Sequence, residues 1–317
     1  MNIVITKGMM AKSKKRTSGL LVGLTFLGLF AFCYLTMVLL RGKDIALLNP
    51  RGFIANEQFR LLLVSTSIML AFAAIVLFFI YFFAWKYRES NHKVEYNSNA
   101  GRSKLLLLTA WASPMLVCAI LISIMLPATQ KLEPQRAIAS ENKELVIRVV
   151  AMQWKWLFMY PEQDIATVNY VQIPVDTPIR FELTADEAPM NSFWIPHLGG
   201  MLYAMTDHVN PLNLMADTIG DYDGGAAEIN GHGFAGMRFT TRVSQKEDFD
   251  SWAEGIVQGS EVLDGVSYSS LLKPSEFNSI ATYYSPTNQE LFEKLLKKYA
   301  GSHGTAHSEH TETEGGH

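Results

Sequence analysis

Cysteine is scarce in this 317-residue chain, which contains only Cys33 and Cys118, both inside apolar stretches. A domain built on disulfides needs several paired cysteines, so that class is excluded. No cysteine follows Cys118, so a thiolate-bound metal is excluded from the rest of the chain. Charge is also sparse, because charged residues make up 18% of the sequence, against about 25% in an average soluble domain. With 49% hydrophobic residues, this composition predicts membrane segments and argues against disorder.

The few charges are unevenly distributed along the chain. Residues 1–104 contain 14 Lys and Arg against 4 Asp and Glu, whereas residues 105–317 contain 13 against 26. Proteins that bind nucleic acid present a basic surface. The acidic half has no excess of basic residues, so we expect no nucleic-acid partner.

Three runs contain no charged residue: 17–40, 61–85 and 105–130. A helix needs about 20 apolar residues to cross a bilayer. The second and third runs therefore predict transmembrane helices at 61–85 and 105–126, within a membrane region that covers residues 1–127. The first run follows a basic segment and has no A-x-A-like cleavage site, so we favour a retained anchor over a cleaved signal peptide.

Basic residues in the short loops predict the orientation in the lipid bilayer. The N-terminal segment carries five, loop 41–60 carries four and loop 86–104 carries five. Positively charged loops stay inside, so the first loop and the C-terminal domain are expected outside. In a bacterium this is a multi-pass protein of the inner (plasma) membrane, with its soluble domain in the periplasm.

Residues 128–243 are typical of an all-β domain. Short runs of branched and aromatic residues alternate with turn formers at intervals near ten residues, which indicates a β-sandwich or barrel. The predicted strands are Leu145–Val150, Met152–Tyr160, Thr167–Ile173, Ile179–Thr184, Leu212–Ala216 and Met237–Val243. Five methionines are expected to pack in its core: Met190, Met201, Met205, Met215 and Met237.

Residues 244–300 predict a small helical C-terminal extension. Ser244–Glu247 and Thr287–Glu290 resemble capping boxes, and Phe249, Trp252, Ala253 and Ile256 follow the first of them on one helical face. Residues 301–317 lack a hydrophobic anchor and are expected to be a disordered, His-rich tail. The histidines of this tail could bind stray metal weakly.

Several separated segments resemble subunit II of respiratory terminal oxidases. Gln153–Trp156 is similar to the Q-W-x-W segment of that family, and Asn191–Pro196 is similar to its H-S-W-x-x-P segment. The stretch from Tyr222 to Met237 resembles the loop that reads C-x-E-x-C-x-x-x-H-x-x-M and holds two coppers in cytochrome c oxidases. The resemblance implies a cupredoxin-like sandwich behind the membrane helices.

The copper ligands of that family are almost all missing here. Only Met237 matches. The other positions are Asn191 for the first histidine, Gly225 and Ile229 for the cysteines, Ala227 for the carboxylate, and Gly233 (or Phe234, counted back from Met237) for the second histidine. A two-copper centre needs thiolates, so no metal is expected on this chain. His197, His208 and His232 could form a different zinc or copper site, but their spacing favours surface or hydrogen-bonded histidines.

The sequence most resembles the quinol oxidase branch, the cytochrome o ubiquinol oxidase subunit II family, in segments 160–169, 190–193 and 233–237. The resemblance implies a complex that oxidises ubiquinol, reduces oxygen to water and translocates protons. Haem and copper would reside on the catalytic subunit I, and other oxidase subunits would be further partners. This chain would contribute no catalytic residue and bind no cofactor. Two alternatives stay open: a copper-relay subunit II of a cytochrome c oxidase, and a membrane-anchored cupredoxin-like binding module outside an oxidase.

Trp154 and Trp156 are the packing candidates within the Q-W-x-W segment. Residues two apart on a strand share a face, so both indoles should point the same way, with Lys155 opposite. Without a copper relay, we expect the indoles to act by packing and by hydrogen bonding through their N–H groups.

Overall fold

The computed structural model describes residues 45–88, 91, 103–188, 190–276, 281–287 and 290–299, together with residues 28, 31, 32, 34, 35 and 38. Contacts divide the chain into residues 1–45 and residues 46–317, and every element named below belongs to the second unit. Most of the uncharged run 17–40, including Cys33, and the whole His-rich tail lie outside the described residues.

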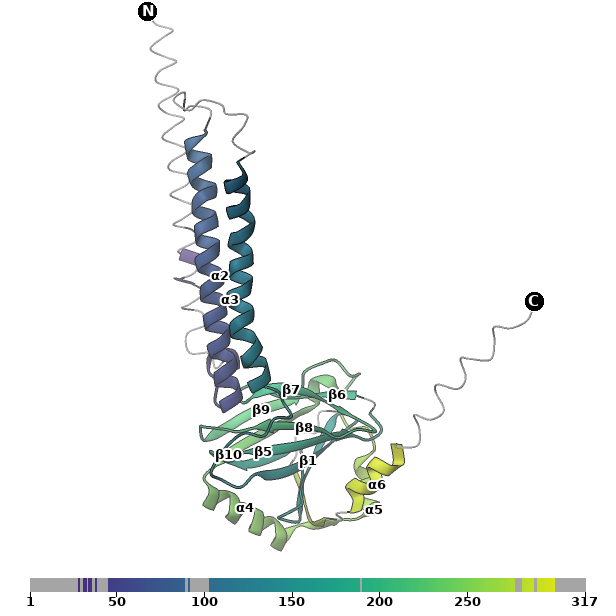
Figure 1. Ribbon diagram of the computed structural model, residues 1–317. Coiled ribbons are helices and arrows are strands. Elements are labelled where there is room, and N and C mark those ends of the chain that lie inside the picture. The colour runs from purple at the N-terminus through teal and green to yellow at the C-terminus, as the bar shows by residue number, and fades with distance from the viewer. Residues whose placement is uncertain are drawn as a thin grey trace, which may run out of the picture. The chain divides into compact units, whose positions relative to one another are not determined.

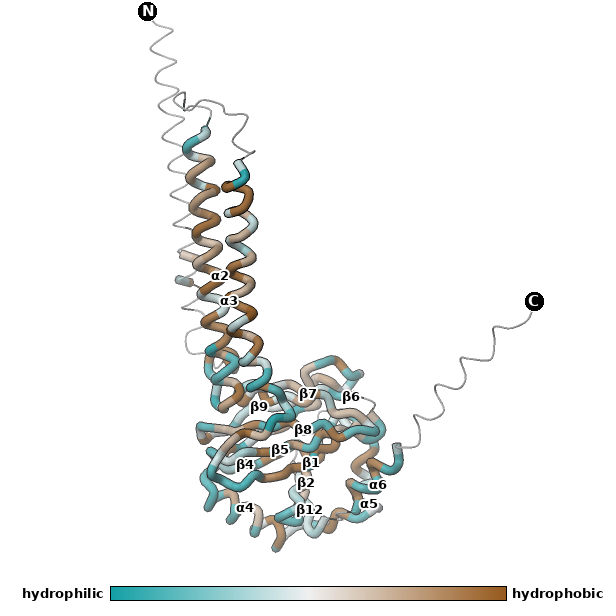
Figure 2. Tube along the Cα trace, in the orientation of Figure 1, coloured by the Kyte–Doolittle hydropathy of each residue, from teal (hydrophilic) through white to brown (hydrophobic). Residues whose placement is uncertain are grey.

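Two long helices carry the apolar runs, α2 (Phe53–Lys86) and α3 (Lys104–Lys131), with a short 3-10 helix η1 (Ala46–Leu48) before them. Both are long and apolar enough to cross a membrane, and their most apolar windows are not buried in the chain itself. Figure 2 shows hydrophobic residues along most of each helix. Both helices are longer than the transmembrane segments predicted from the sequence. α2 starts before Leu61, and α3 continues through Pro127 to Lys131 instead of ending at 126.

The sandwich consists of a seven-stranded and a five-stranded sheet (Figure 1). The first has the order β11-β12-β3-β2-β1-β5-β8 and the second β4-β10-β9-β6-β7. The bounds in the first sheet are β1 Leu145–Met152, β2 Lys155–Tyr160, β3 Ile165–Val168, β5 Ile179–Ala185, β8 Asn210–Leu214, β11 Glu261–Leu263 and β12 Thr282–Thr287. Those in the second are β4 Tyr170–Pro174, β6 Met190–Ile195, β7 Gly199–Met205, β9 Gly220–Ala226 and β10 Arg238–Ser244.

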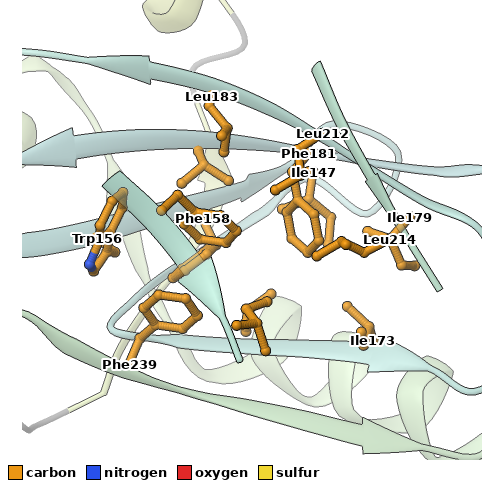
Figure 3. Packing of buried hydrophobic residues seen from close by; sticks show 14 of the residues in the cluster. Ile147, Trp156, Phe158, Ile173, Ile179, Phe181, Leu183, Leu212, Leu214 and Phe239 are labelled. Carbon is orange, nitrogen blue, oxygen red and sulfur yellow. The ribbon is translucent and has the colours of Figure 1, made fainter. Parts of the chain in front are cut away.

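Aromatic side chains fill the space between the two sheets (Figure 3). The Trp156 ring meets Phe193 edge to face at a centroid distance of 5.3 Å, and Phe193 stacks on Phe239 at 5.2 Å. Phe158 and Phe181 complete this fully buried cluster. Such rings bury about 150–250 Å² each, so this cluster contributes strongly to the hydrophobic stabilisation of the domain.

Asn169 explains why one predicted strand is two. The run Thr167–Ile173 was expected to be continuous, but Asn169 has a φ of 56° and breaks it. Its side-chain Oδ1 accepts a hydrogen bond from the backbone N–H of Trp156. β3 therefore ends at Val168 in one sheet, and β4 begins at Tyr170 in the other. Asn adopts the left-handed region more easily than branched residues do, which permits the sheet change here.

The C-terminal extension is only partly helical, so the prediction of a helical extension was incomplete. It contains α4 (Lys246–Gly259), α5 (Gly265–Leu271) and α6 (Glu290–Tyr299). Two short strands between them, β11 and β12, widen the seven-stranded sheet, with Thr282 of β12 opposite Val168 of β3. The extension is thereby built into the sandwich and is not a separate appendage.

The prediction for α4 is confirmed for its buried face and wrong for its N-terminal cap. Phe249, Ala253 and Ile256 are buried as expected, but the capping box is wrong. Gln245 occupies the N-cap position without a side-chain bond, and Ser244 is the last residue of β10. For the second predicted box, residues 288 and 289 lie outside the described residues.

Two of the five methionines contradict the core-packing expectation. Met237 is fully buried, but Met190 is 50% exposed and Met201 is 38% exposed. Both lie on the edge pair β6–β7, where alternate side chains face away from the core. The sequence does not mark these strands clearly, because apolar residues occupy both of their faces.

The first turn of α2 is anchored in the sandwich. Ile54 and Ala55 are buried, and the Ala55 N–H donates to the Leu198 carbonyl at 3.1 Å. Gly199 adopts a φ of 108°, and a Cβ there would lie 2.9 Å from the Ala55 nitrogen. Only glycine suits both this backbone conformation and this close approach. The start of β7 is thus fixed against the start of α2.

Candidate functional site

Three residues meet where the resemblance places the copper centre. Asn191 on β6 and Met237 before β10 are both buried. The Asn230 side-chain amide donates to Asn191 Oδ1 and to Met237 Sδ, the latter at 3.0 Å. Asn230 therefore links Asn191 and Met237, the positions that correspond to the first histidine and to the methionine of the copper motif.

Asn230, not Ile229, occupies the position that faces this site. Ile229 is 84% exposed. The motif places its second cysteine seven residues before the methionine, and Asn230 stands seven residues before Met237. Counting back from Met237 gives Asn230, whereas counting forward from Gly225 gives Ile229, because the loop is one residue longer than the motif. Of the two residues, Asn230 is the one whose side chain contacts Asn191 and Met237.

The two glycines at predicted ligand positions are closely packed. Gly225 lies in β9 opposite Trp194 and Arg238, and a Cβ there would come 2.9 Å from the Met237 carbonyl oxygen. At Gly233 a Cβ would come 2.3 Å from the Trp154 ring. Neither position has room for a larger side chain without movement of its neighbours.

Trp154 and Trp156 do not share a strand face, so that prediction is wrong. Trp154 lies in the turn between β1 and β2 with a φ of 64°, and its ring covers Gly231 and Gly233. Its Nε1–H donates to the Asn230 carbonyl at 3.4 Å. Trp156 is on β2 inside the core, and its Nε1 has no hydrogen-bond partner in the described part of the chain.

Lys155, which lies between these two tryptophans in the sequence, is buried. Its Nζ donates to the carbonyls of Leu271 and Lys273, both at 2.8 Å. Those carbonyls are at the C-terminal end of α5, where a helix favours a positive charge. Burial lowers the pKa of the Lys155 ammonium below its ordinary value. This cation fastens the C-terminal extension to the Q-W-x-W segment.

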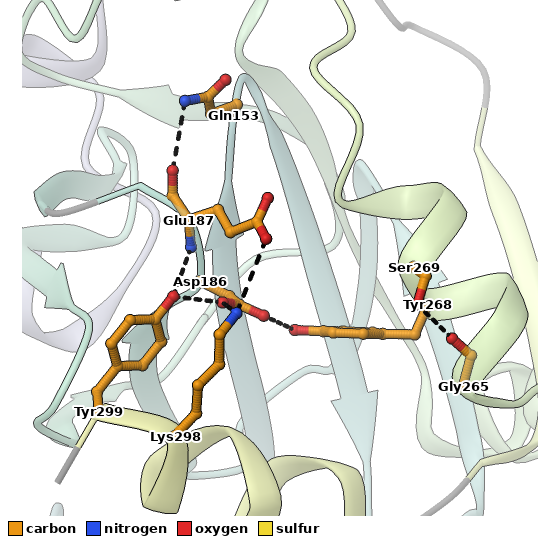
Figure 4. A network of polar contacts seen from close by, with 8 residues as sticks. All are labelled: Gln153, Asp186, Glu187, Gly265, Tyr268, Ser269, Lys298 and Tyr299. Carbon is orange, nitrogen blue, oxygen red and sulfur yellow. Dashed lines mark hydrogen bonds and ion pairs between the residues drawn. The ribbon is translucent and has the colours of Figure 1, made fainter. Parts of the chain in front are cut away.

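A buried carboxylate fastens the extension a second time (Figure 4). Asp186, which follows β5, is 2% exposed and accepts from the Tyr268 hydroxyl at 2.7 Å and the Tyr299 hydroxyl at 2.6 Å. The Lys298 ammonium lies 2.8 Å from the same carboxylate. Burial and the hydrogen bond to Asp186 raise the pKa of Tyr268 well above 10, so this hydroxyl remains a donor.

The donor set at the copper position does not fit a two-copper centre. It consists of two amides and one thioether, and copper centres of this type require thiolates. A cavity of about 150 Å³ beside it is lined by residues that include Met152, Trp154 and Asn191. Within the described residues, no group of three or more His, Cys, Asp and Glu could hold a metal ion. His208 and His232 are exposed, and the His197 ring packs 5.3 Å from that of Tyr222.

The fold and the site together define a membrane-anchored β-sandwich protein whose copper position is built from amide and thioether groups. No family model matches the chain. Subunit 2 of the cytochrome bo(3) ubiquinol oxidase of Pseudomonas putida is 41% identical, over 91% of this chain and 89% of that protein. Ubiquinol oxidase subunit 2 of Acetobacter aceti is 38% identical, over 83% of this chain and 85% of that protein. The chain therefore belongs to the ubiquinol oxidase subunit 2 family.

Among solved structures, the periplasmic domain of subunit II of cytochrome oxidase from Bradyrhizobium japonicum is 23% identical, with a TM-score of 0.35. The match covers 38% of this chain and 96% of that one. The predicted fold class is confirmed in outline: two apolar helices, a β-sandwich and a small C-terminal extension. The family also agrees with the quinol oxidase prediction and not with the two alternatives, a copper-relay subunit and a module outside an oxidase.

Proposed function

We propose that this chain is the non-catalytic subunit II of a complex that oxidises ubiquinol, reduces oxygen to water and translocates protons. Haem and copper are assigned to subunit I, and none to this chain. The observation that carries the proposal is the Asn191–Asn230–Met237 contact, because it places a neutral amide where a copper relay needs a thiolate. The names of the related proteins supply the substrate.

The chemistry of the electron donor explains why such a relay is dispensable. Cytochrome c is soluble and docks outside the membrane, so its oxidase needs a metal in the outer domain. Ubiquinol dissolves in the bilayer and delivers electrons directly to haem in the membrane subunit. The outer domain of this chain then serves as a docking surface and a cover, and α2 and α3 supply apolar surface for lipid and subunit I.

The chain is membrane-anchored through α2 and α3, and we place its sandwich on the periplasmic side of a bacterial inner membrane. The basic residues in the N-terminal segment and in loop 86–104 favour this orientation. The acidic sandwich is then exported and the basic loop is retained.

The metal assignment is tested by adding copper to the purified full chain in detergent and to a variant that ends at Gly301. The variant removes the four tail histidines while the described domain is kept. We expect no thiolate-type visible band and an unchanged melting temperature in either protein. A stoichiometric visible band in both proteins would contradict the proposal, whereas a weak signal confined to the full chain identifies the tail. The oxidase assignment is tested separately by the haem spectrum of material purified through a tag on this chain.

A further inference from the structure

A hollow of about 310 Å³ lies on the outer side of the five-stranded sheet, over the start of β10. Its lining includes Arg238 and Thr240 of β10, Asp223 of β9, Asn169, and Ala235 and Gly236 of the 3-10 turn η3 (Phe234–Gly236). Sites for small molecules usually measure about 300–1,000 Å³. This space, which we call the β10 hollow, is therefore large enough for a small ligand.

Two opposite charges line the hollow without a protein partner. Arg238 and Asp223 are both exposed, and neither forms an ion pair within the described part of the chain. On the same two strands, Arg242 and Asp221 stand directly opposite each other and are joined by two hydrogen bonds of 2.7 and 2.8 Å. Arg238 and Asp223 are instead diagonal neighbours. Diagonal positions lie about 7–8 Å apart, which leaves room for a ligand between the two charged groups.

The backbone of Arg238 faces the hollow with an unused donor and acceptor. β4 begins at Tyr170, opposite Thr240, so the parallel strand β10 begins two residues before it. The Thr240 N–H donates to the Asn169 carbonyl on the β4 side at 3.2 Å. Alternate residues of a strand direct their backbone groups to the same side, so the N–H and C=O of Arg238 also point there, before β4 begins. The Asn169 N–H does not reach them, because it donates to the Trp156 carbonyl at 2.8 Å.

We infer that the β10 hollow binds a short zwitterionic peptide of the dipeptide class. The ligand carboxylate pairs with the Arg238 guanidinium, the ligand ammonium pairs with the Asp223 carboxylate, and the single amide faces the Arg238 backbone. The length agrees, because an extended chain spans about 3.3–3.6 Å per residue and a dipeptide therefore about 7 Å. The inference goes beyond the proposed function and does not depend on it, since every group involved belongs to the sandwich.

The test is a calorimetric titration of L-alanyl-L-alanine into the purified full chain in detergent. We expect saturable binding at one site per chain. Arg238→Gln and Asp223→Asn should each weaken binding at least about tenfold, because each removes a charge-assisted hydrogen bond. Their melting temperatures should match that of wild type, since neither side chain has a protein partner to lose. Arg242→Gln changes the same strand outside the hollow and is the matched control, which should bind as wild type does.

Modified ligands test the two ends and the amide separately. Acetyl-alanyl-alanine lacks the ammonium and alanyl-alaninamide lacks the carboxylate, so each should bind wild type at least about tenfold more weakly. An analogue with an ester oxygen in place of the amide N–H should also bind more weakly, because it cannot donate to the Arg238 carbonyl. No saturable binding to wild type, or equal affinity of wild type and Arg238→Gln, would overturn the inference.

The same titration of the haem-bearing complex distinguishes a ligand site from a contact with another subunit. We expect the complex to bind the dipeptide with the affinity of the free chain. Binding by the free chain alone would overturn the inference, because another subunit would then fill the hollow. A chain that binds the dipeptide but co-purifies with no haem would instead contradict the proposed function and leave the inference intact.

Discussion

Replacing Asp186 with alanine should be among the most destabilising single changes outside the aromatic core. The carboxylate is 2% exposed and receives two tyrosine hydroxyls, at 2.7 and 2.6 Å. Hydrogen bonds to a charged group contribute about 1.5–3 kcal/mol each. The contact with Lys298 adds little, because its side chain is 47% exposed and solvent screens it. We therefore expect a loss of about 3–5 kcal/mol of unfolding free energy.

That loss is a large fraction of the roughly 5–15 kcal/mol by which folded proteins are stable. It should lower the melting temperature by roughly 6–20 °C for a chain of this size. The assay is near-ultraviolet circular dichroism of the full chain in detergent during heating. Tyr268→Phe removes one bond to Asp186 and should cost less than half as much, whereas Tyr299→Phe also removes the bond that its hydroxyl accepts from the Glu187 N–H and should cost more than Tyr268→Phe. A melting temperature for Asp186→Ala within about 2 °C of wild type would refute the reasoning, because this shift corresponds to less than about 1 kcal/mol.

Further outcomes follow from the packing and the charges. Trp156→Phe should retain most of the complex, because the indole N–H has no partner in the described chain, whereas Trp156→Ala should cost about 3–5 kcal/mol and reduce the yield of haem-bearing complex. Gly233→Ala should lower the free energy of unfolding by about 1–3 kcal/mol, measured with denaturant, since the new Cβ would overlap the Trp154 ring. Burial lowers the pKa of Lys155, so the unfolded chain binds more protons just below pH 10.5, and the stability of wild type relative to Lys155→Met should rise with pH in that range. A protease with access only to the periplasm should digest residues 128–317 and spare loop 86–104, and the reverse pattern would contradict the charge argument.

The sequence predicted the elements whose signal is local. The uncharged runs identified both membrane helices, and the helical spacing of Phe249, Ala253 and Ile256 identified the buried face of α4. The helix ends were not predictable in this way. α2 begins before Leu61 because its first turn is held by the sandwich, through residues far away in the sequence such as Leu198.

The errors arose where long-range contacts decide the outcome. β11 and β12 become strands because β3 offers an edge, and their short sequences do not show this. Trp154 was expected within the strand Met152–Tyr160 because branched and aromatic residues fill that run, but its left-handed φ places it in a turn. Lys155 and Asp186 were not predicted as anchors, since their partners lie in the C-terminal extension, 82 to 118 residues away in the sequence. Asn230 was within reach of sequence reasoning, through its spacing from Met237.

Oxygen uptake by a complex purified through this chain tests the central claim most directly. Ubiquinol and reduced cytochrome c are supplied in turn to the same preparation, at equal electron-donating capacity. The account predicts rapid uptake with ubiquinol and only background uptake with cytochrome c, because the Asn191–Asn230–Met237 site provides no relay for a soluble donor. Uptake driven by cytochrome c at a rate comparable to that with ubiquinol would contradict it.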